Sequence, residues 1–296
     1  MIRRLVERAY RSLPVVRELM QVRDAIGHEI GILRALHLTR LLEFEAAHHP
    51  RYGDPRRLLR YGHQVHSQGG VDGILHEIFR RIGETDRTFV EIGVGDGTEN
   101  NTAFLLVRGW SGFWIDRGAS FRRTLARHGV GGDRVRGEVA FVRRETIAAL
   151  FARLGVPAEF DLLSIDVDQN TYYVWEALKE YRPRVVAIEY NAAIPADVDW
   201  KVAYDGERVW DESQNFGASL KALEILGRER GYALVGCDFA GTDAFFVRDD
   251  LVGDRFLAPF TAENHYEPVR YQWLHRWGHR RGLLDVAAPL PRRRDT

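Results

Sequence analysis

The chain has 296 residues, of which 45% are hydrophobic and 28% charged, a composition that suits one large α/β domain with appendages or two smaller domains. The formal net charge is zero, but residues 67–269 hold 33 acidic and 23 basic side chains, which argues against a nucleic-acid substrate because its phosphates would be repelled there. The single cysteine, Cys237, excludes an internal disulfide framework and a zinc site made of several cysteines.

The first predicted element is an amphipathic helix over residues 12–47. Apolar residues recur there at spacings of three and four, at Val15, Leu19, Val22, Ile26, Ile30, Leu33, Leu41 and Phe44. This apolar face could cover the main domain or pair with a second subunit, so residues 12–47 are a candidate for homo-oligomer formation. Two prolines and two glycines in residues 48–62 then predict a linker. No apolar run has membrane-spanning length and the N-terminus lacks a signal-peptide core, so we expect a cytoplasmic protein with no membrane span.

From residue 72 the sequence alternates between helical and strand patterns. Five strand patterns are each followed by a helical pattern, at residues 88–94, 112–116, 137–142, 160–167 and 184–190. This alternation predicts a parallel sheet with right-handed crossovers. After a long insertion come a helix and two strands, 232–237 and 243–248, whose link is too short for a crossover and predicts an antiparallel hairpin.

The expected fold is therefore α/β and Rossmann-like, with a mostly parallel seven-stranded sheet that ends in an antiparallel hairpin. We expect a helical extension and linker over residues 1–62, the main domain over 63–250 and a C-terminal extension over 251–296.

The stretch FVEIGVGDGTENNT, residues 89–102, leads from a strand through a glycine-rich turn into a helical pattern. Its glycines are Gly93, Gly95 and Gly97, so the third comes one position too early for a dinucleotide fingerprint. Its acidic residues are Glu91, Asp96 and Glu99, which would repel a pyrophosphate. A cofactor with a cationic centre and no phosphate fits better, and S-adenosylmethionine is such a molecule. Asp116, at the end of the second strand, would accept hydrogen bonds from both ribose hydroxyls.

Acidic residues also follow the fourth and fifth strands, in SIDVDQN and AIEYNA. Asp166 and Asp168 end the fourth strand, and Glu189 and Asn191 end the fifth. The ends of neighbouring parallel strands lie together, so these side chains form a hard-oxygen cluster suited to Mg²⁺, with Asp166, Glu189 and Asn191 as ligands. Alternatively, Asp168 is a metal-free general base or binds substrate hydroxyls, or the acids only cap the following helices.

Several stretches together resemble the FkbM-type class I S-adenosylmethionine-dependent methyltransferases, and most closely the members found near polysaccharide and glycolipid biosynthesis genes. These stretches are residues 66–79, 89–102, 162–175, 185–192 and 216–238. The resemblance covers roughly residues 60–250 and implies O-methylation of sugar or polyketide hydroxyls. It also implies that Ser67 and Gln68 line the cleft with support from Asp72, and that Glu145 contacts the adenine of the cofactor.

Residues 191–215 are too long for a plain connection and carry three large aromatic side chains, Trp200, Tyr204 and Trp210. Such an insertion suits a lid or a specificity loop that stacks on a sugar, or else an aromatic mini-core or a dimer contact. His63, His66 and His265 are candidate bases, because imidazole titrates near neutral pH.

The sequence thus predicts an S-adenosylmethionine-dependent O-methyltransferase with a small-molecule or oligosaccharide acceptor, such as a glycolipid precursor. Asp166, Asp168 and His265 are its candidate catalytic residues. A nicotinamide-dependent oxidoreductase and a non-catalytic partner subunit of the same fold are the alternatives.

Overall fold

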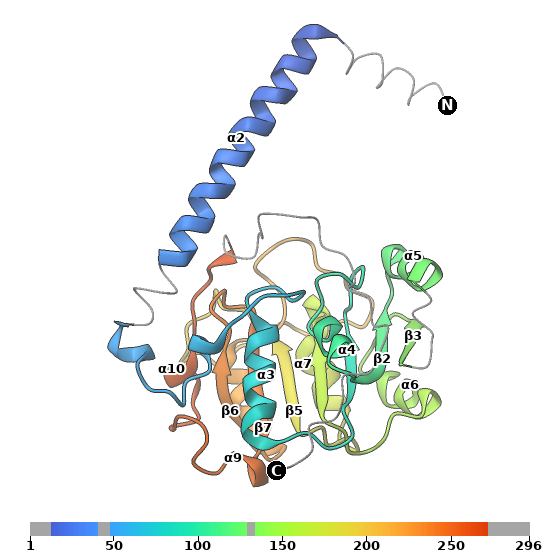
Figure 1. The fold of residues 1–296 in the computed structure, drawn as a ribbon. Helices are drawn as coiled ribbons and strands as arrows, with labels where there is room; N and C mark the ends of the chain where they lie inside the picture. Colours follow the sequence, from blue (N-terminus) through green and yellow to red (C-terminus); the bar gives the residue numbers. More distant parts are fainter. Residues whose placement is uncertain (1–12, 41–47, 129–133, 272–296) are drawn as a thin grey trace.

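The computed structural model describes residues 13–40, 48–128 and 134–271. Its centre is a seven-stranded sheet in the order β3-β2-β1-β4-β5-β7-β6 (Figure 1). The strands are β1 (Thr88–Ile92), β2 (Ser111–Asp116), β3 (Val135–Val139), β4 (Leu162–Ile165), β5 (Val185–Glu189), β6 (Tyr232–Cys237) and β7 (Asp243–Arg248). Only β7 runs against its neighbours, because it pairs antiparallel with both β5 and β6. The predicted fold class, a mostly parallel Rossmann-like sheet with an antiparallel hairpin at its end, is confirmed.

Helices cover both faces of the sheet. On one face lie α3 (Val71–Ile82), α4 (Ala103–Val107) and α5 (Ala119–His128), whose apolar side chains form one buried cluster with the strands. On the other face lie α6 (Ile147–Leu154), α7 (Thr171–Ala177) and α8 (Leu220–Glu229), which form a second cluster. The short helices α9 (Asp249–Val252) and α10 (Ala262–His265) follow the hairpin. The result is a three-layer α/β/α domain.

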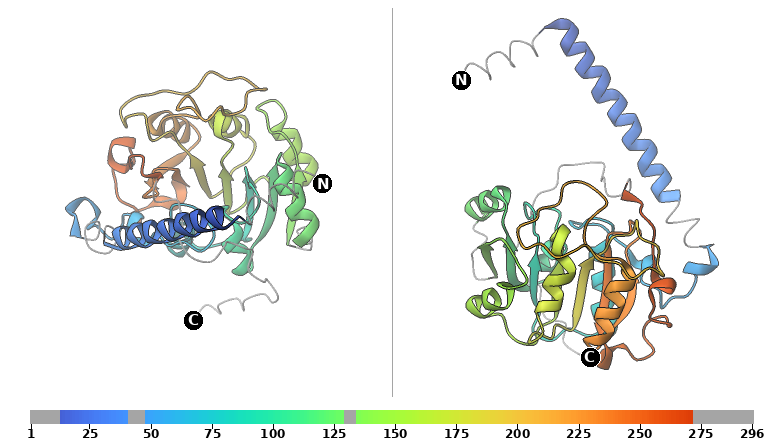
Figure 2. Two further views of the ribbon diagram at one scale, coloured as in Figure 1. Left: turned by 90° about the horizontal axis from the view of Figure 1, so that it is seen from above. Right: turned by 180° about the vertical axis from the view of Figure 1, so that it is seen from behind.

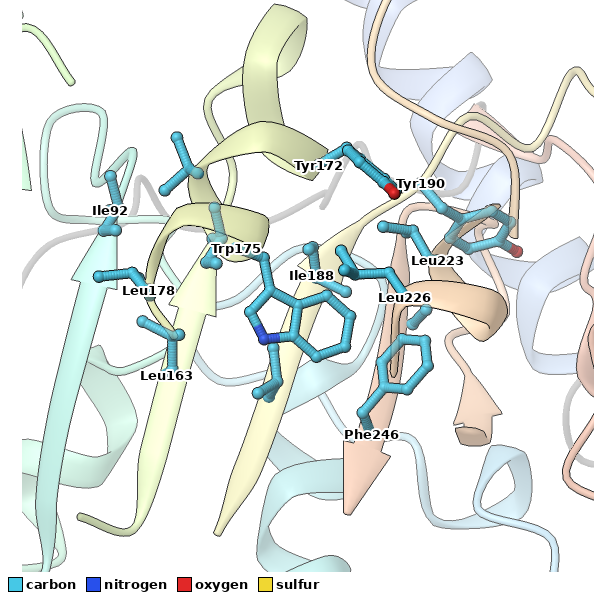
Figure 3. Close-up of a cluster of buried hydrophobic side chains, with 14 of the residues drawn as sticks. Ile92, Leu163, Tyr172, Trp175, Leu178, Ile188, Tyr190, Leu223, Leu226 and Phe246 are labelled. Carbon is cyan, nitrogen blue, oxygen red and sulfur yellow. The ribbon is translucent and has the colours of Figure 1, made fainter. Parts of the chain in front are cut away.

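The second cluster holds α7 and α8 against their face of the sheet. Trp175 of α7 is fully buried and its ring lies 4.9 Å from that of Phe246 on β7 (Figure 3). Leu223 and Leu226 of α8 pack beside them, three residues apart on one helical face. Each such side chain contributes about 1.5–3 kcal/mol when it leaves water completely, so this layer is a main source of the stability of the domain.

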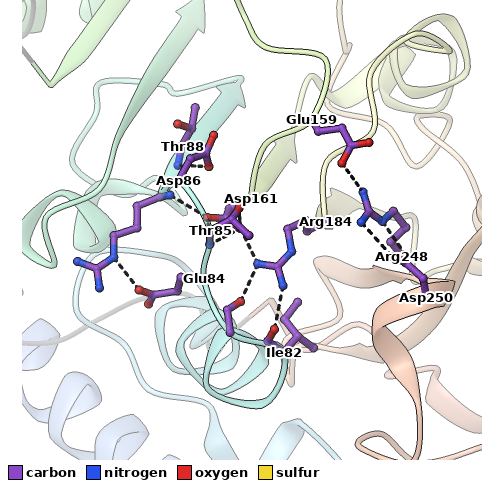
Figure 4. Close-up of polar contacts among 12 residues, drawn as sticks. Ile82, Glu84, Thr85, Asp86, Thr88, Glu159, Asp161, Arg184, Arg248 and Asp250 are labelled. Carbon is purple, nitrogen blue, oxygen red and sulfur yellow. Dashed lines mark hydrogen bonds and ion pairs between the residues drawn. The ribbon is translucent and has the colours of Figure 1, made fainter. Parts of the chain in front are cut away.

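A polar network ties the amino end of β4 to the segment that precedes β1 (Figure 4). The buried carboxylate of Asp161 accepts hydrogen bonds from the amides of Thr85 and Arg87, and from Nη1 of Arg184 at 2.7 Å. Arg184 also donates to the carbonyl oxygens of Ile82 and Gly83 at the end of α3. A buried ion pair is stable only when its remaining hydrogen-bonding groups are satisfied, and here they are.

Helix α2 (Pro14–Thr39) projects away from the domain, as Figure 1 and the rear view in Figure 2 show. One side of it is an apolar stripe formed by Val15, Leu19, Val22, Ile26, Ile30 and Leu33, each 44–66% exposed. Of the two roles predicted for this face, covering the main domain is therefore wrong. The predicted stripe positions Leu41 and Phe44 lie outside the described residues. No helix in the described ranges has the length and apolar character needed to cross a membrane.

Candidate active site

The glycine-rich turn follows β1 and lies against the end of β4. Gly93, Gly95 and Gly97 all have positive φ, at 89°, 66° and 81°. At Gly93 a Cβ atom would lie only 1.5 Å from the backbone oxygen of Asp166, so a side chain cannot be accommodated there. The amide of Asp166 donates to the carbonyl of Ile92 at 2.9 Å, which closes the two strand ends together. The glycines thus allow the backbone to turn at the point where β1 and β4 are closest.

The buried side chain of Glu91 stabilises the segment that follows the glycine-rich turn. Its side chain is 3% exposed and accepts hydrogen bonds from Asn100 Nδ2 at 2.7 Å, from the amides of Asn101 and Thr102, and from the hydroxyl of Thr102. Burial raises the pKa of this carboxyl group, and the hydrogen bonds oppose that rise. The predicted cofactor-binding role of Glu91 is thus an indirect one in this geometry: it holds the turn that would bind the ligand.

Asp116 links the turn to the end of β2. Its Oδ2 accepts a hydrogen bond from the amide of Gly95 at 2.8 Å, and its Oδ1 accepts one from the amide of Gly118 at 2.5 Å. Each carboxylate oxygen has a second lone pair, so the group can still accept hydroxyl donors from a ligand. The side chain faces the cleft described next.

An open cleft lies at the carboxyl edge of the sheet, and its space, including the solvent at its mouth, amounts to about 580 Å³. Its walls come from the ends of β1, β2 and β4, from the segment after β3 and from the insertion: residues 92–93, 115–117, 140–142, 166–168, 170 and 208–210. The sheet order reverses between β1 and β4, and ligands of doubly wound folds bind at such switch points.

Three carboxyl groups meet beside the cleft. Asp166, Asp168 and Glu189 each offer an oxygen within 4.8 Å of the others. Asp166 is open to the cleft, but protein surrounds it on its other sides, and this desolvation together with the charge of Asp168 raises its pKa to about 7. Desolvation and the charge of Asp166 raise the pKa of Glu189 well above its ordinary value. At neutral pH this cluster therefore holds protons that isolated carboxyl groups would have lost.

Asn191, a predicted metal ligand, does not join this cluster. Its side-chain amide is fully buried and donates to the carbonyl oxygens of Gln214 and Phe216, while its Oδ1 accepts from the amide of Ala193 at 3.1 Å. All its polar atoms are used to close the two ends of the insertion. Asp168 takes the third place in the cluster instead.

The segment before α3 lies next to the glycine-rich turn. The carboxylate of Asp72 accepts hydrogen bonds from the amides of His66 and Ser67 and from the hydroxyl of Ser67, all at 2.7–2.8 Å. Gln68 reaches across and donates to Glu99 at 3.1 Å. Ser67 is completely buried, so it supports the wall of the site and does not face the cleft.

Two other predicted site residues lie away from the cleft. Glu145 is exposed at the start of α6 and bonds with the hydroxyl of Tyr204, whereas residues 140–142 occupy the place after β3 that faces the ligand space. His265 is 3% exposed in α10, 3.1 Å from the carbonyl of Leu257, and burial lowers its pKa to about 3. The structure brings neither together with Asp166, and a histidine this hard to protonate is ill suited to accept a proton at neutral pH.

The insertion after β5 reaches back over the cleft. Arg208, Val209 and Trp210 line it, and the indole of Trp210 lies 5.9 Å from the ring of Phe216. Tyr204 instead packs against Tyr173 at 5.0 Å, as expected for an aromatic mini-core. The sequence analysis missed Arg117 and Phe141, which stack on one another and line the cleft. The position of Arg117 directly after the second strand could have indicated it, whereas Phe141 lies within the predicted third strand and gave no such signal.

The fold is that of a Rossmann-like α/β protein, and the cleft lies at the switch point of its sheet. No family model matches the sequence, and no curated protein matches it. Several solved structures are similar to this chain in fold. An O-methyltransferase family protein from Burkholderia thailandensis has a TM-score of 0.37 and 15% identity over 58% of this chain and 52% of its own.

Two further solved structures are similar. The N-terminal domain of EvdMO1 with SAH bound has a TM-score of 0.38 and 15% identity over 60% of this chain and 79% of its own. CalO1, a methyltransferase in calicheamicin biosynthesis in its SAH-bound form, has a TM-score of 0.32 and 16% identity over 60% and 54%. The match thus spans about half the length of the first and third proteins, and at these identities it concerns the fold alone.

Proposed function

We propose that this protein is an S-adenosylmethionine-dependent O-methyltransferase. The observation that carries the proposal is the character of the cleft, which combines an apolar wall with acidic groups at the switch point. Ile92, Ile115 and the segment 140–142 supply apolar surface, and Asp116, Asp166 and Asp168 supply the acids. A ligand with a flat nucleoside and a cationic centre suits such a cleft better than a pyrophosphate does.

Different residues of the cleft would bind different parts of this ligand. Asp116 is the acceptor for the ribose hydroxyls, and residues 140–142 with Phe141 are the apolar surface for the adenine. The carboxylates at the end of β4 favour the positive charge of the sulfonium and ammonium groups. The same carboxylates disfavour the alternative of a nicotinamide dinucleotide, because its pyrophosphate would lie against Asp166.

The cluster at the end of β4 also suits activation of an acceptor hydroxyl. Bound S-adenosylmethionine supplies a methyl group that an oxygen nucleophile can attack. An alcohol is a weak nucleophile until its proton is removed. With its pKa at about 7, Asp166 can accept a proton at neutral pH, and its neighbour Asp168 stabilises the protonated form because two carboxylates at this distance repel each other.

A divalent cation would be an alternative way to activate the hydroxyl. The residues fit one: Asp166, Asp168 and Glu189 offer three hard oxygens near one point, and Oε2 of Glu189 is buried with no hydrogen-bond partner among the described residues. Mg²⁺ prefers such ligands and would neutralise their mutual repulsion. These three residues would hold it, and Asn191 would not.

For the acceptor we propose a hydroxyl of a sugar, an oligosaccharide or a glycolipid precursor. Trp210 offers a flat aromatic surface at the cleft, and Asn170, which also lines the cleft, has a buried Oδ1 that lacks a donor within the described structure. An aromatic face and an unused hydrogen-bond acceptor in one cleft suit a ligand with apolar C–H faces and several hydroxyl groups.

The first test is a pair of calorimetric titrations of the folded protein, one with S-adenosylhomocysteine and one with NADH. Binding of the first alone supports the proposal. Binding of NADH alone would replace it with the oxidoreductase alternative, and binding of neither would remove both and leave a non-catalytic partner subunit.

The second test separates the two modes of activation. Activity is measured with labelled S-adenosylmethionine and a panel of sugars and glycolipids, with and without EDTA. Unchanged activity in EDTA rejects the cation and retains Asp166 as the base. Asp166→Asn should abolish turnover and keep S-adenosylhomocysteine binding, whereas Glu145→Gln, at an exposed residue outside the cleft, is the matched control and should alter neither.

A further inference from the structure

The apolar stripe of α2 is a feature that the proposed site does not explain. Its six residues, Val15, Leu19, Val22, Ile26, Ile30 and Leu33, are each 44–66% exposed although they form one continuous row. Figure 1 and the rear view in Figure 2 show the helix projecting away from the domain. Helices in proteins owe most of their stability to packing of an apolar face, so a row of this length indicates a partner.

The spacing of the apolar residues in the stripe indicates how a partner helix would pack against it. Each residue of its first half recurs eleven positions later: Val15 with Ile26, Leu19 with Ile30 and Val22 with Leu33. An eleven-residue repeat corresponds to 3.67 residues per turn, close to the 3.6 of a straight α-helix. The stripe therefore stays on one side along the helix, as a seam between two nearly straight helices requires.

Charged residues flank the stripe with opposite sign on its two sides. Glu18 and Glu29, also eleven residues apart, lie along one side. Arg23 lies along the other, five residues after Glu18, and the sequence repeats this spacing with an arginine five residues after Glu29. In the structure Arg23 pairs with its neighbour Asp24, and both are 67% exposed, a kind of pair that is weak and exchangeable.

This arrangement of charges selects one partner and one orientation. When two copies of the helix pack in parallel, the acidic side of each faces the basic side of the other, so Glu18 meets Arg23 of the second copy. An antiparallel pair would place acid against acid. An anionic membrane surface would meet the acidic side as well, whereas membrane-binding helices carry lysine and arginine on both sides.

We propose that α2 is a dimerisation element that packs in parallel against α2 of a second copy of this chain. The helix has 26 residues and is thus about 39 Å long, so a contact strip about 10 Å wide buries roughly 400 Å² on each copy. That is below the size of a permanent interface. The expected state is therefore a reversible monomer–dimer equilibrium and not a permanent dimer.

The test is sedimentation equilibrium of the full chain from about 1 to 100 μM, with two matched variants. Ile26→Asp lies in the stripe and should raise the dissociation constant at least a hundredfold, with an unchanged circular dichroism spectrum of the domain. Gln21→Asp lies on the opposite side of the helix and should leave it within threefold. A wild-type monomer at 100 μM, or an unaffected dimer in Ile26→Asp, overturns the proposal.

Orientation is tested by charge exchange and by disulfide formation. Glu18→Lys and Arg23→Glu should each weaken the dimer, and the double variant should restore it. Cys237 is the only native cysteine and is buried, so Val15→Cys should oxidise to a covalent dimer only if the helices are parallel. Absence of both effects, or flotation of the protein with anionic phospholipid vesicles in place of self-association, overturns the assignment.

Discussion

Two glycines of the turn after β1 form a matched pair for testing how tightly that turn is held. Gly93 and Gly95 both have positive φ, at 89° and 66°. A Cβ atom at Gly95 meets nothing within 4 Å, whereas one at Gly93 would lie 1.5 Å from the backbone oxygen of Asp166. Both Gly93→Ala and Gly95→Ala place an alanine at positive φ, and Gly93→Ala adds the collision.

The expected losses of stability follow from these distances. Left-handed strain costs about 1–2 kcal/mol, and the stiffer unfolded chain returns about 0.4–1, so Gly95→Ala should lose about 1 kcal/mol. At Gly93 the carbonyl of Asp166 must also retreat from 1.5 Å to at least the 3.0 Å that real Cβ contacts keep. That movement opens the 2.9 Å hydrogen bond from the amide of Asp166 to Ile92. The lost bond and the overpacking add about 2–4 kcal/mol, for a total of about 3–5.

Urea unfolding followed by circular dichroism gives both free energies, and calorimetry with S-adenosylhomocysteine reports the cleft. We expect Gly93→Ala to lose ligand binding together with its stability, since the strand ends that it separates carry Asp166. Equal losses for the two variants, within about 1 kcal/mol, would refute the close crossing of β1 and β4.

Three other outcomes are expected. Asp116→Asn should weaken S-adenosylhomocysteine binding about ten- to a hundredfold in calorimetry, because a charge-assisted hydrogen bond contributes about 1.5–3 kcal/mol. Asp161→Ala should destabilise the fold by about 3–5 kcal/mol in urea unfolding and leave ligand affinity unchanged, because it strands the buried guanidinium of Arg184; Asp161→Ala/Arg184→Met should recover part of the loss. The pKa of Asp166 is raised from 3.8 to about 7 on folding, so its contribution to stability is present below pH 3.8 and is lost as the pH rises through 7. Unfolding measured from pH 4 to 8 should therefore show the wild type losing stability relative to Asp166→Asn, and parallel curves would contradict this.

Much of the sheet could be predicted because strand signals in a parallel sheet are local. The hairpin strands were predicted with the bounds that the structure has, and β1 began where expected. The third strand was predicted over 137–142 but spans Val135–Val139, because residues 140–142 leave the sheet to line the cleft. Apolar residues in a ligand-facing wall and in a buried strand give the same sequence signal.

The site was harder to predict because the hydrogen bonds and burial of a side chain depend on residues that are far away in the sequence. Asn191 has a side-chain oxygen of the kind that binds metals. Its side chain is instead hydrogen-bonded to the carbonyl groups of residues 214 and 216, which are distant in the sequence. Likewise, His265 in α10 is buried by tertiary packing, which its local sequence does not predict. The placement of Asp116 and Asp166 at the cleft was predictable because a strand end fixes where its last side chain points.

The crowding of carboxyl groups at the end of β4 makes their protonation responsive to a cation that binds beside them. A compound that brings a cation beside Asp166 and Glu189 releases protons from them, so its binding heat depends on the buffer that takes up those protons. S-adenosylmethionine and its neutral demethylated product differ by that one charge. Comparing their titrations in two buffers counts the protons displaced by the sulfonium, before any acceptor has been identified.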